Sequence, residues 1–304
     1  MSKETEKVLR EIEKFSKDKN FSSEEEANAA IADFIKSYSG KMSKENQKGQ
    51  KGLKMKEALD SWDYLDMALE ADTSEEALKY AKKALKLDKN LLDADVLIAD
   101  LSATDREDLK LRFEALIKKA EKVLKKKGLF PDGVGVFWGI IETRPYMRLR
   151  GAYVKLLLEL GKYKKAMNEC EELIVLSEND NMGMRYSLMA LYAFFEDKDK
   201  AMELLKKYEE DCVMMNLPLM ALYYKLDDYE KAKEYLKRMT TGNDSINQFI
   251  DMLINEDSDE KIEDIVNKGM YQLGSVEEIV IAFEEGVFLY NTTGGLMEWV
   301  VQQI

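Results

Sequence analysis

Residues 142–181 read ETRPYMRLRGAYVKLLLELGKYKKAMNECEELIVLSENDN, and the spacing of the apolar side chains in this stretch decides the fold. They recur every three or four positions, the period that lines one face of an α-helix, in two consecutive runs. The first run is Tyr146, Leu149, Tyr153, Leu156, Leu157 and Leu160, and the second is Tyr163, Ala166, Met167, Cys170, Leu173 and Ile174. Gly161 lies between the runs and suits the left-handed conformation that ends a helix, because it has no Cβ. The stretch therefore predicts an antiparallel helical hairpin.

The hairpin pattern recurs on both sides of this stretch. Alanines occupy equivalent positions at Ala77, Ala166, Ala201 and Ala232, and the last three are separated by 35 and 31 residues. A helix–turn–helix unit that recurs about every 34 residues is the signature of a helical-repeat array, in which each unit packs on its neighbours. The pattern predicts an array over residues 55–240, interrupted at 127–139 by an aromatic loop that packs its rings onto the neighbouring hairpins.

The details of the unit resemble the tetratricopeptide repeat, since Gly161, Tyr163 and Ala166 fit its G-x-Y-x-x-A core. In that repeat the glycine makes the turn, the alanine lets two helices approach closely, and the aromatic ring fills the wedge beside them. The strings WGIIETRPYMR (138–148) and NDNMGMRY (179–186) also resemble a family of bacterial and archaeal tetratricopeptide-like proteins of unknown function. The resemblance covers about residues 58–300. It implies a right-handed α–α superhelix and no enzymatic activity.

The segments outside the array predict helices as well. Residues 3–17 and 23–38 are predicted amphipathic helices, and Ser39–Lys54 is a polar, lysine-rich predicted linker, so that residues 1–54 form an N-terminal extension. Residues 241–304 predict three or four short helices that cap the array, because an array needs an element that covers its last apolar face. With only three prolines and many strong helix formers, the chain is predicted to be all-α.

Composition limits the function. The chain has 304 residues, 45% of them hydrophobic, and its 46 basic and 59 acidic residues give a formal net charge of −13. This balance argues against nucleic-acid partners and anionic membranes, which require basic surfaces. There is no histidine, and Cys170 and Cys212 are the only thiols, so we expect no cofactor and no metal site. The N-terminus has no apolar signal segment, and we expect a cytoplasmic protein.

Arginines are concentrated near the central hairpin. Three of the eight, Arg144, Arg148 and Arg150, fall within seven residues, and Arg185 lies at the start of the next repeat. The resemblance implies that first helices line a concave groove, where an arginine fork can bind a carboxylate through two hydrogen bonds. One hypothesis is that Arg144, Arg148 and Arg185 clamp an acidic peptide or a C-terminal carboxylate. The alternative is that they pair with glutamates of the repeats and brace them.

Tyr146, Tyr153 and Tyr186 are further candidates for groove contacts, although tyrosines at helical spacing are more often core residues with one solvated edge. The sequence thus predicts a non-enzymatic interaction scaffold that binds a peptide or protein partner in its concave groove. One alternative is a regulatory protein that senses a peptide. A less favoured one is an enzyme with a carboxylate-based site. The oligomeric state stays open.

Overall fold

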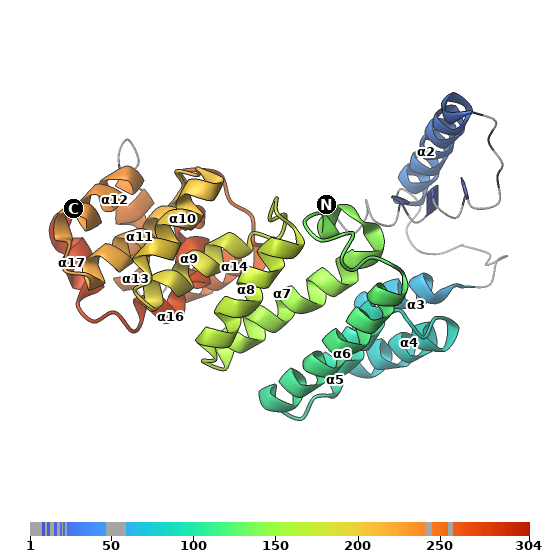
Figure 1. The fold of residues 1–304 in the computed structure, drawn as a ribbon, viewed down its shortest axis with the longest axis horizontal. Coiled ribbons are helices and arrows are strands. Elements are labelled where there is room, and N and C mark those ends of the chain that lie inside the picture. The colour runs from blue at the N-terminus through green and yellow to red at the C-terminus, as the bar shows by residue number, and fades with distance from the viewer. Residues whose placement is uncertain are drawn as a thin grey trace. The chain divides into compact units, whose positions relative to one another are not determined.

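The computed structural model describes residues 8–9, 11–12, 15–16, 19, 21, 23–46, 59–240, 245–254 and 258–304. These residues form helices and connecting loops without a β-strand, so the predicted all-α class is confirmed (Figure 1). They divide into two compact units, Met1–Asp63 and Tyr64–Ile304. Within the described part of the chain, no helix has the length and apolar character needed to cross a lipid bilayer.

The first unit contains the long helix α2 (Glu24–Asn46). As its sequence predicts, it begins with a cap, because Ser23 Oγ accepts a hydrogen bond from the Glu26 N–H at 3.2 Å. The predicted end at residue 38 is wrong, and the first part of the predicted linker is helical. A lone glycine such as Gly40 costs a helix only about 1 kcal/mol, and the lysines and methionine after it favour helix. Residues 47–54 and most of the predicted helix at 3–17 lie outside the described residues.

The second unit is a series of helices in which sequence neighbours pack together. They are α3 (Ser61–Leu69), which starts at the end of the first unit, α4 (Ser74–Leu87), α5 (Leu92–Ser102), α6 (Arg106–Lys126), α7 (Arg144–Glu159), α8 (Tyr163–Leu176), α9 (Met184–Phe194), α10 (Lys198–Tyr208), α11 (Val213–Lys225), α12 (Tyr229–Thr240), α13 (Ser245–Ile254), α14 (Asp259–Lys268), α15 (Val276–Glu285), α16 (Val287–Tyr290) and α17 (Leu296–Gln303). The pairs α7/α8, α9/α10 and α11/α12 are in contact, as expected for hairpins (Figure 1).

Small residues and turn residues have the roles that their positions predict. Ala166, Ala201 and Ala232 are completely buried in the second helices of their hairpins, where a larger side chain would push neighbouring helices apart. Gly161 has a φ of +66°, the left-handed conformation expected between α7 and α8. Thr73 caps α4 by accepting the Glu76 N–H at 3.3 Å.

Thr104 lies three residues before Glu107, a spacing that predicts Thr104 as the cap of α6, but this prediction is wrong in its residue. Asp105, rather than Thr104, is the N-cap, and its Oδ1 accepts the Asp108 N–H at 2.8 Å. The Thr104 backbone N–H instead donates to the Asp108 carboxylate at 3.0 Å. The carboxylate of Asp105 therefore takes the position that the hydroxyl was predicted to fill.

The aromatic loop at 127–139 packs into the second unit, as predicted. The Phe137 ring is completely buried and lies 4.7 Å from the Phe130 ring and 6.4 Å from the Tyr146 ring, between centroids. Gly135 exchanges backbone hydrogen bonds with the connection between α8 and α9, donating to Leu176 O at 3.1 Å and accepting from Glu178 N at 2.9 Å. Ring packing and backbone hydrogen bonds therefore both hold the loop against the hairpins.

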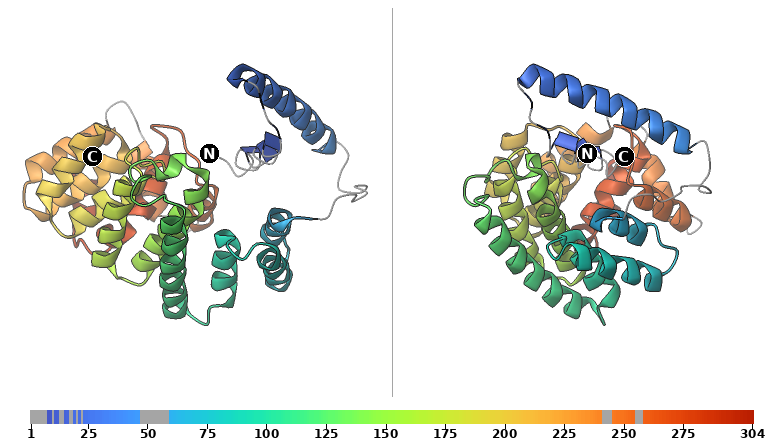
Figure 2. Two further views of the ribbon diagram at one scale, coloured as in Figure 1. Left: turned by 45° about the vertical axis from the view of Figure 1, so that its right-hand side comes forward. Right: turned by 90° about the vertical axis from the view of Figure 1, so that its right-hand side faces the viewer.

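The described residues of the C-terminal tail form five helices, more than predicted, and these do not lie only on the last hairpin. Helices α15 and α16 contact both α9 and α11, and the orange-red tail runs alongside the yellow helices of the array in Figure 2. The Phe288 ring of α16 lies 4.9 Å from the Tyr163 ring and 5.7 Å from the Phe194 ring. As a result α11 is buried on all sides from Val213 to Tyr223. The tail covers first helices that were predicted to line an open groove.

Candidate functional site

Arg144 and Arg150, on α7, are buried and engaged with the array. Arg144 Nε donates to the Trp138 carbonyl oxygen at 2.9 Å, and its guanidinium lies 5.7 Å from the Trp138 ring. Arg150 donates from Nε to Glu169 at 2.9 Å and from Nη2 to Glu172 at 2.6 Å, both on α8. These bonds join α7 to the loop before it and to its hairpin mate.

Arg148 joins α7 to the preceding repeat. Its Nε and Nη2 donate to the two carboxylate oxygens of Asp93 on α5, at 3.1 and 2.7 Å. This is the paired, fork-shaped geometry in which arginine binds a carboxylate most specifically. Arg148 therefore holds the kind of ligand that the clamp hypothesis assigned to a partner, but the ligand belongs to the same chain.

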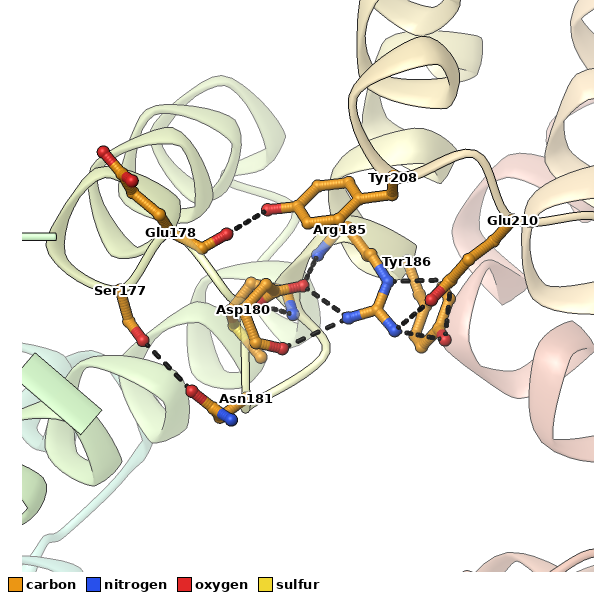
Figure 3. Close-up of polar contacts among 9 residues, drawn as sticks. Ser177, Glu178, Asp180, Asn181, Arg185, Tyr186, Tyr208 and Glu210 are labelled. Carbon is orange, nitrogen blue, oxygen red and sulfur yellow. Dashed lines mark hydrogen bonds and ion pairs between the residues drawn. The ribbon is translucent and has the colours of Figure 1, made fainter. Parts of the chain in front are cut away.

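Arg185 lies at the centre of the polar network at the start of α9 (Figure 3). Its Nη1 donates to Asp180 Oδ2 at 3.0 Å, while Nε and Nη2 each donate to a Glu210 oxygen at 2.9 Å. The guanidinium carbon lies 4.2 Å from the Tyr186 ring centroid and 5.2 Å from that of Tyr208. Figure 3 shows the guanidinium between the two carboxylates, so its donors face acceptors of the array.

Asp180 has a second role in this network. Its carboxylate accepts the backbone N–H groups of Met184 and Arg185, both at 2.8 Å, and so satisfies the first turn of α9. Burial raises the pKa of Asp180, although the hydrogen bonds from Arg185 and Met184 act in the opposite direction. Aspartates and asparagines such as those at 179–181 favour helix starts, and here Asp180 bonds to the first turn although Gly183 occupies the N-cap position.

The candidate tyrosines also bond to carboxylates of the array. Tyr146 donates to Glu121 at 3.0 Å, Tyr153 to Glu114 at 2.7 Å, and Tyr186 to Glu210 at 3.1 Å. Burial raises the pKa of Tyr153 to about 12, so it stays a donor at neutral pH. The six predicted binding residues thus fall into separate clusters. Only Arg185 and Tyr186 meet each other, at 2.6 Å between Nη2 and the hydroxyl oxygen.

These pairs have the geometry that the brace alternative predicts for the arginines. An acidic partner would have to displace Asp93 from Arg148, or Asp180 and Glu210 from Arg185, before it could bind. No contact among the described residues shows whether an external partner binds these arginines. The clamp hypothesis therefore stays a prediction.

A pocket of about 230 Å³ opens beside the start of α11. Apart from the thiol of Cys212, none of its residues was a candidate from the sequence. Its polar walls include Asp211, Asn216 and Glu278, and its apolar walls include Val213, Met239 and Leu273. One signal in the sequence could have indicated it: Asn216 is the single polar side chain in the apolar run from Val213 to Leu222.

One buried side-chain acceptor in this pocket has no hydrogen-bond donor among the described residues. Asn216 is 3% exposed, and its Nδ2 donates to Asp211 Oδ1 at 2.7 Å, which fixes the orientation of the amide. Its Oδ1 is one of two buried side-chain polar atoms in the described residues without a hydrogen-bond partner. Glu278, 2% exposed, accepts the Gly274 N–H at 2.6 Å, and no described lysine or arginine pairs with it. The pocket therefore has one buried acceptor that lacks a donor, beside a buried carboxylate without a described cationic partner.

Two other side chains complete the chemistry of the pocket walls. Arg238 is already engaged, since its Nη2 donates to Glu234 at 2.6 Å and its Nη1 lies 4.0 Å from Asp211 Oδ1. Burial raises the pKa of the Cys212 thiol, and the carboxylates of Glu210 and Glu278 add to the increase. Cys212 is therefore a neutral thiol at physiological pH rather than an activated nucleophile.

Apolar side chains are exposed in the loop that contributes Leu273 to the pocket and in the helix before that loop. Leu273, which also lines the pocket, is 82% exposed, and Met270 is 74% exposed. Val266 on α14 and Tyr271 in the same loop are exposed as well. Larger groups of exposed apolar side chains commonly mark surfaces that bind other proteins. We call these four residues the apolar rim.

The sequence matches no protein-family model, and neither the comparison with curated proteins nor that with solved structures found a match. Within the ranges that the structure describes, no group of three or more acidic or cysteine side chains is arranged to hold a metal ion. The function is therefore inferred from the geometry of this chain.

Proposed function

We propose that this protein is a non-enzymatic interaction scaffold that binds a peptide or protein partner at the C-terminal end of a tetratricopeptide-like superhelix. The observation that carries the proposal is the apolar rim beside the α11 pocket. Leu273 and Met270 are among the most exposed large apolar side chains of the described residues, and they lie three residues apart in one loop. Covering them with a partner would remove apolar surface from water, which favours association.

Features of the repeats support the superhelical part of the proposal. The three hairpins α7/α8, α9/α10 and α11/α12 follow one another, and their equivalent alanines Ala166, Ala201 and Ala232 are all completely buried. Such repeats bury a continuous core while leaving side chains at their ends and edges available to partners. The resemblance to tetratricopeptide-like proteins favours the same role.

The position of the tail decides which surface we assign to the partner. At α9 and α11 the first helices are covered by α15 and α16, so a partner cannot reach them without displacing part of the core. The apolar rim is accessible without any such change. We therefore place the partner at the rim and the pocket rather than along α9 and α11.

Site-specific photocrosslinking tests this function. A photoreactive phenylalanine analogue at position 273 of the full chain should crosslink to one discrete partner in native host extract, and excess unlabelled protein should compete. The matched control is position 111, because Leu111 on α6 is also exposed, at 59%. The same diffuse products from both positions would contradict the proposal. Unlabelled Met270→Ser/Leu273→Ser protein should fail to compete.

A second candidate function, peptide sensing, is favoured by the packing of α15 and α16 on the array. If a regulatory peptide replaced the tail, contacts such as that between Ser187 and Glu285 would break. Hydrogen exchange of the α16 amides should then accelerate when the partner binds. Unchanged exchange in the presence of saturating partner would rule this candidate out.

A further inference from the structure

The negative charge of the protein is concentrated in the C-terminal segment that contributes Glu278 to the α11 pocket. Residues 241–304 contain thirteen aspartates and glutamates against two lysines and no arginine, and so account for nearly all of the formal charge of −13. Glu278, which lines the pocket, belongs to this segment, while Asp211 lies just before α11. A field of this sign attracts cations and repels anions.

The hydrogen-bond inventory of the pocket specifies the ligand further. Asn216 Oδ1 is a buried acceptor without a donor, and Glu278 is a buried carboxylate whose described hydrogen bond comes from a single backbone N–H. Leaving the Asn216 oxygen unpaired is costly, because a buried acceptor has lost its hydrogen bonds to water, and a buried carboxylate is further stabilised by a cation beside it. A ligand that supplies several N–H donors and a positive charge would satisfy both residues at once.

We propose that the pocket beside α11 binds a primary ammonium group, with Glu278 and Asp211 as its counter-ions and Asn216 Oδ1 as a third acceptor. A protonated amine has three N–H donors and no acceptor, which complements walls that offer acceptors. Among the described residues that line the pocket, the one cation, Arg238, donates to Glu234 at 2.6 Å.

The ammonium group could be supplied by a lysine side chain of a protein or by a free amine. The apolar rim favours the lysine, because Leu273 both lines the pocket and continues into the exposed loop. A peptide could place its lysine in the pocket and neighbouring apolar side chains on Met270 and Leu273. The choice of a lysine as the source rests on the proposed scaffold function, whereas the ammonium chemistry of the pocket does not.

Calorimetric titration of the full chain tests the site with three probes. The peptide Ac-Ala-Leu-Lys-Leu-Ala-amide should bind saturably, the same peptide with an acetylated lysine should bind at least tenfold more weakly, and n-butylammonium should bind more weakly than the lysine peptide. Acetylation removes the charge and two donors but keeps the aliphatic stem. Equal affinity for the acetylated and unmodified peptides would overturn the proposal.

Variants of the protein locate the binding. Glu278→Gln and Asn216→Leu should each weaken the lysine peptide at least tenfold, and Asp211→Asn, at an exposed position, should weaken it with no risk to folding. Glu114→Gln on α6 is the control, because it removes a carboxylate far along the chain from the pocket, and it should bind like the wild type. Unchanged affinity in the Asp211 and Asn216 variants would overturn the location.

The outcomes separate this inference from the scaffold function. Binding of n-butylammonium as tight as that of the peptide would support the ammonium site but contradict a protein source for its ligand. The absence of saturable binding by any probe would overturn the site, while a competed crosslink at position 273 would still support the scaffold.

Discussion

The starts of α9 and α11 are equivalent positions in consecutive hairpins, yet their polar groups are satisfied in opposite ways. At α9, the Asp180 carboxylate accepts two backbone N–H groups of the first turn, and Arg185 donates to both Asp180 and Glu210, so donors and acceptors match. At α11, Cys212 occupies the N-cap without a side-chain hydrogen bond, and Asn216 keeps an acceptor without a partner. Matched groups hold a structure together, while unmatched ones leave capacity for a ligand.

The difference separates two roles that look alike in the sequence. Arg185 is a charged residue of the kind that suggests binding, but its partners are internal. Asn216 lies in an apolar run that suggests only core, but it faces a pocket. The residue type alone therefore did not show whether a polar side chain stabilises the array or binds a ligand.

The largest expected effect on stability is at the start of α9, where donors and acceptors match. Arg185→Ala should lower the free energy of unfolding by about 3 kcal/mol, because it leaves the buried Asp180 carboxylate without its counter-ion. Urea denaturation followed by circular dichroism measures this change. A loss below about 1 kcal/mol, together with weaker partner binding, would instead support the clamp hypothesis for this arginine.

Arg148→Ala should have a smaller effect of the same sign, about 1 kcal/mol, since the Arg148 and Asp93 side chains are 34% and 21% exposed and water can replace part of the pair. The same denaturation assay applies. The double variant with Arg185→Ala should lose the sum of the two effects and leave partner binding unchanged. Normal stability with lost binding would show that these arginines act on a partner.

Asn216→Leu should change stability in the opposite direction, by zero to about 1 kcal/mol of stabilisation, because an unpaired buried acceptor is replaced by an apolar group of similar size. Asp211, which loses the amide donor, is exposed and can bond to water. The melting temperature measures the change. A destabilisation above about 1 kcal/mol would mean that the amide is a structural member of the core and that the comparison with Arg185 fails.

The smallest expected effect is the pH dependence of stability that comes from the ion pair between Lys165 and Glu114. The hydrogen bond from Lys165 lowers the pKa of Glu114 below its ordinary 4.5, with the Tyr153 hydroxyl contributing further. A lowered pKa in the folded state stabilises the protein above the ordinary pKa, and this contribution is lost as the pH falls through the lowered value. The pair is partly exposed, so the loss should stay under about 1 kcal/mol.

Unfolding of wild type and Glu114→Gln between pH 6 and pH 3 tests this expectation. The difference in free energy of unfolding between them should shrink as the pH falls. A difference that stays constant over this range would show that the pair does not depend on the charge of Glu114.

Local order in the sequence determined the helices of this protein. The three-and-four spacing of apolar residues set the hairpins, Gly161 set a turn, and Ala166, Ala201 and Ala232 marked the close contacts, because these depend on neighbours a few residues away. The end of α2 was missed for the same kind of reason. Helix propensities differ by tenths of a kcal/mol, so a polar segment with one glycine can still continue a helix.

Only the tertiary structure decided what surrounds those helices. The packing of α15 and α16 on α9 and α11 joins segments about eighty residues apart, and nothing in the periodicity of either segment specifies the other. The pocket likewise unites Asp211, Asn216 and Glu278, which a turn and several helices separate. Whether a polar side chain is a brace or a binding group depends on which partners fold beside it, and that competition among acceptors and donors is settled in three dimensions.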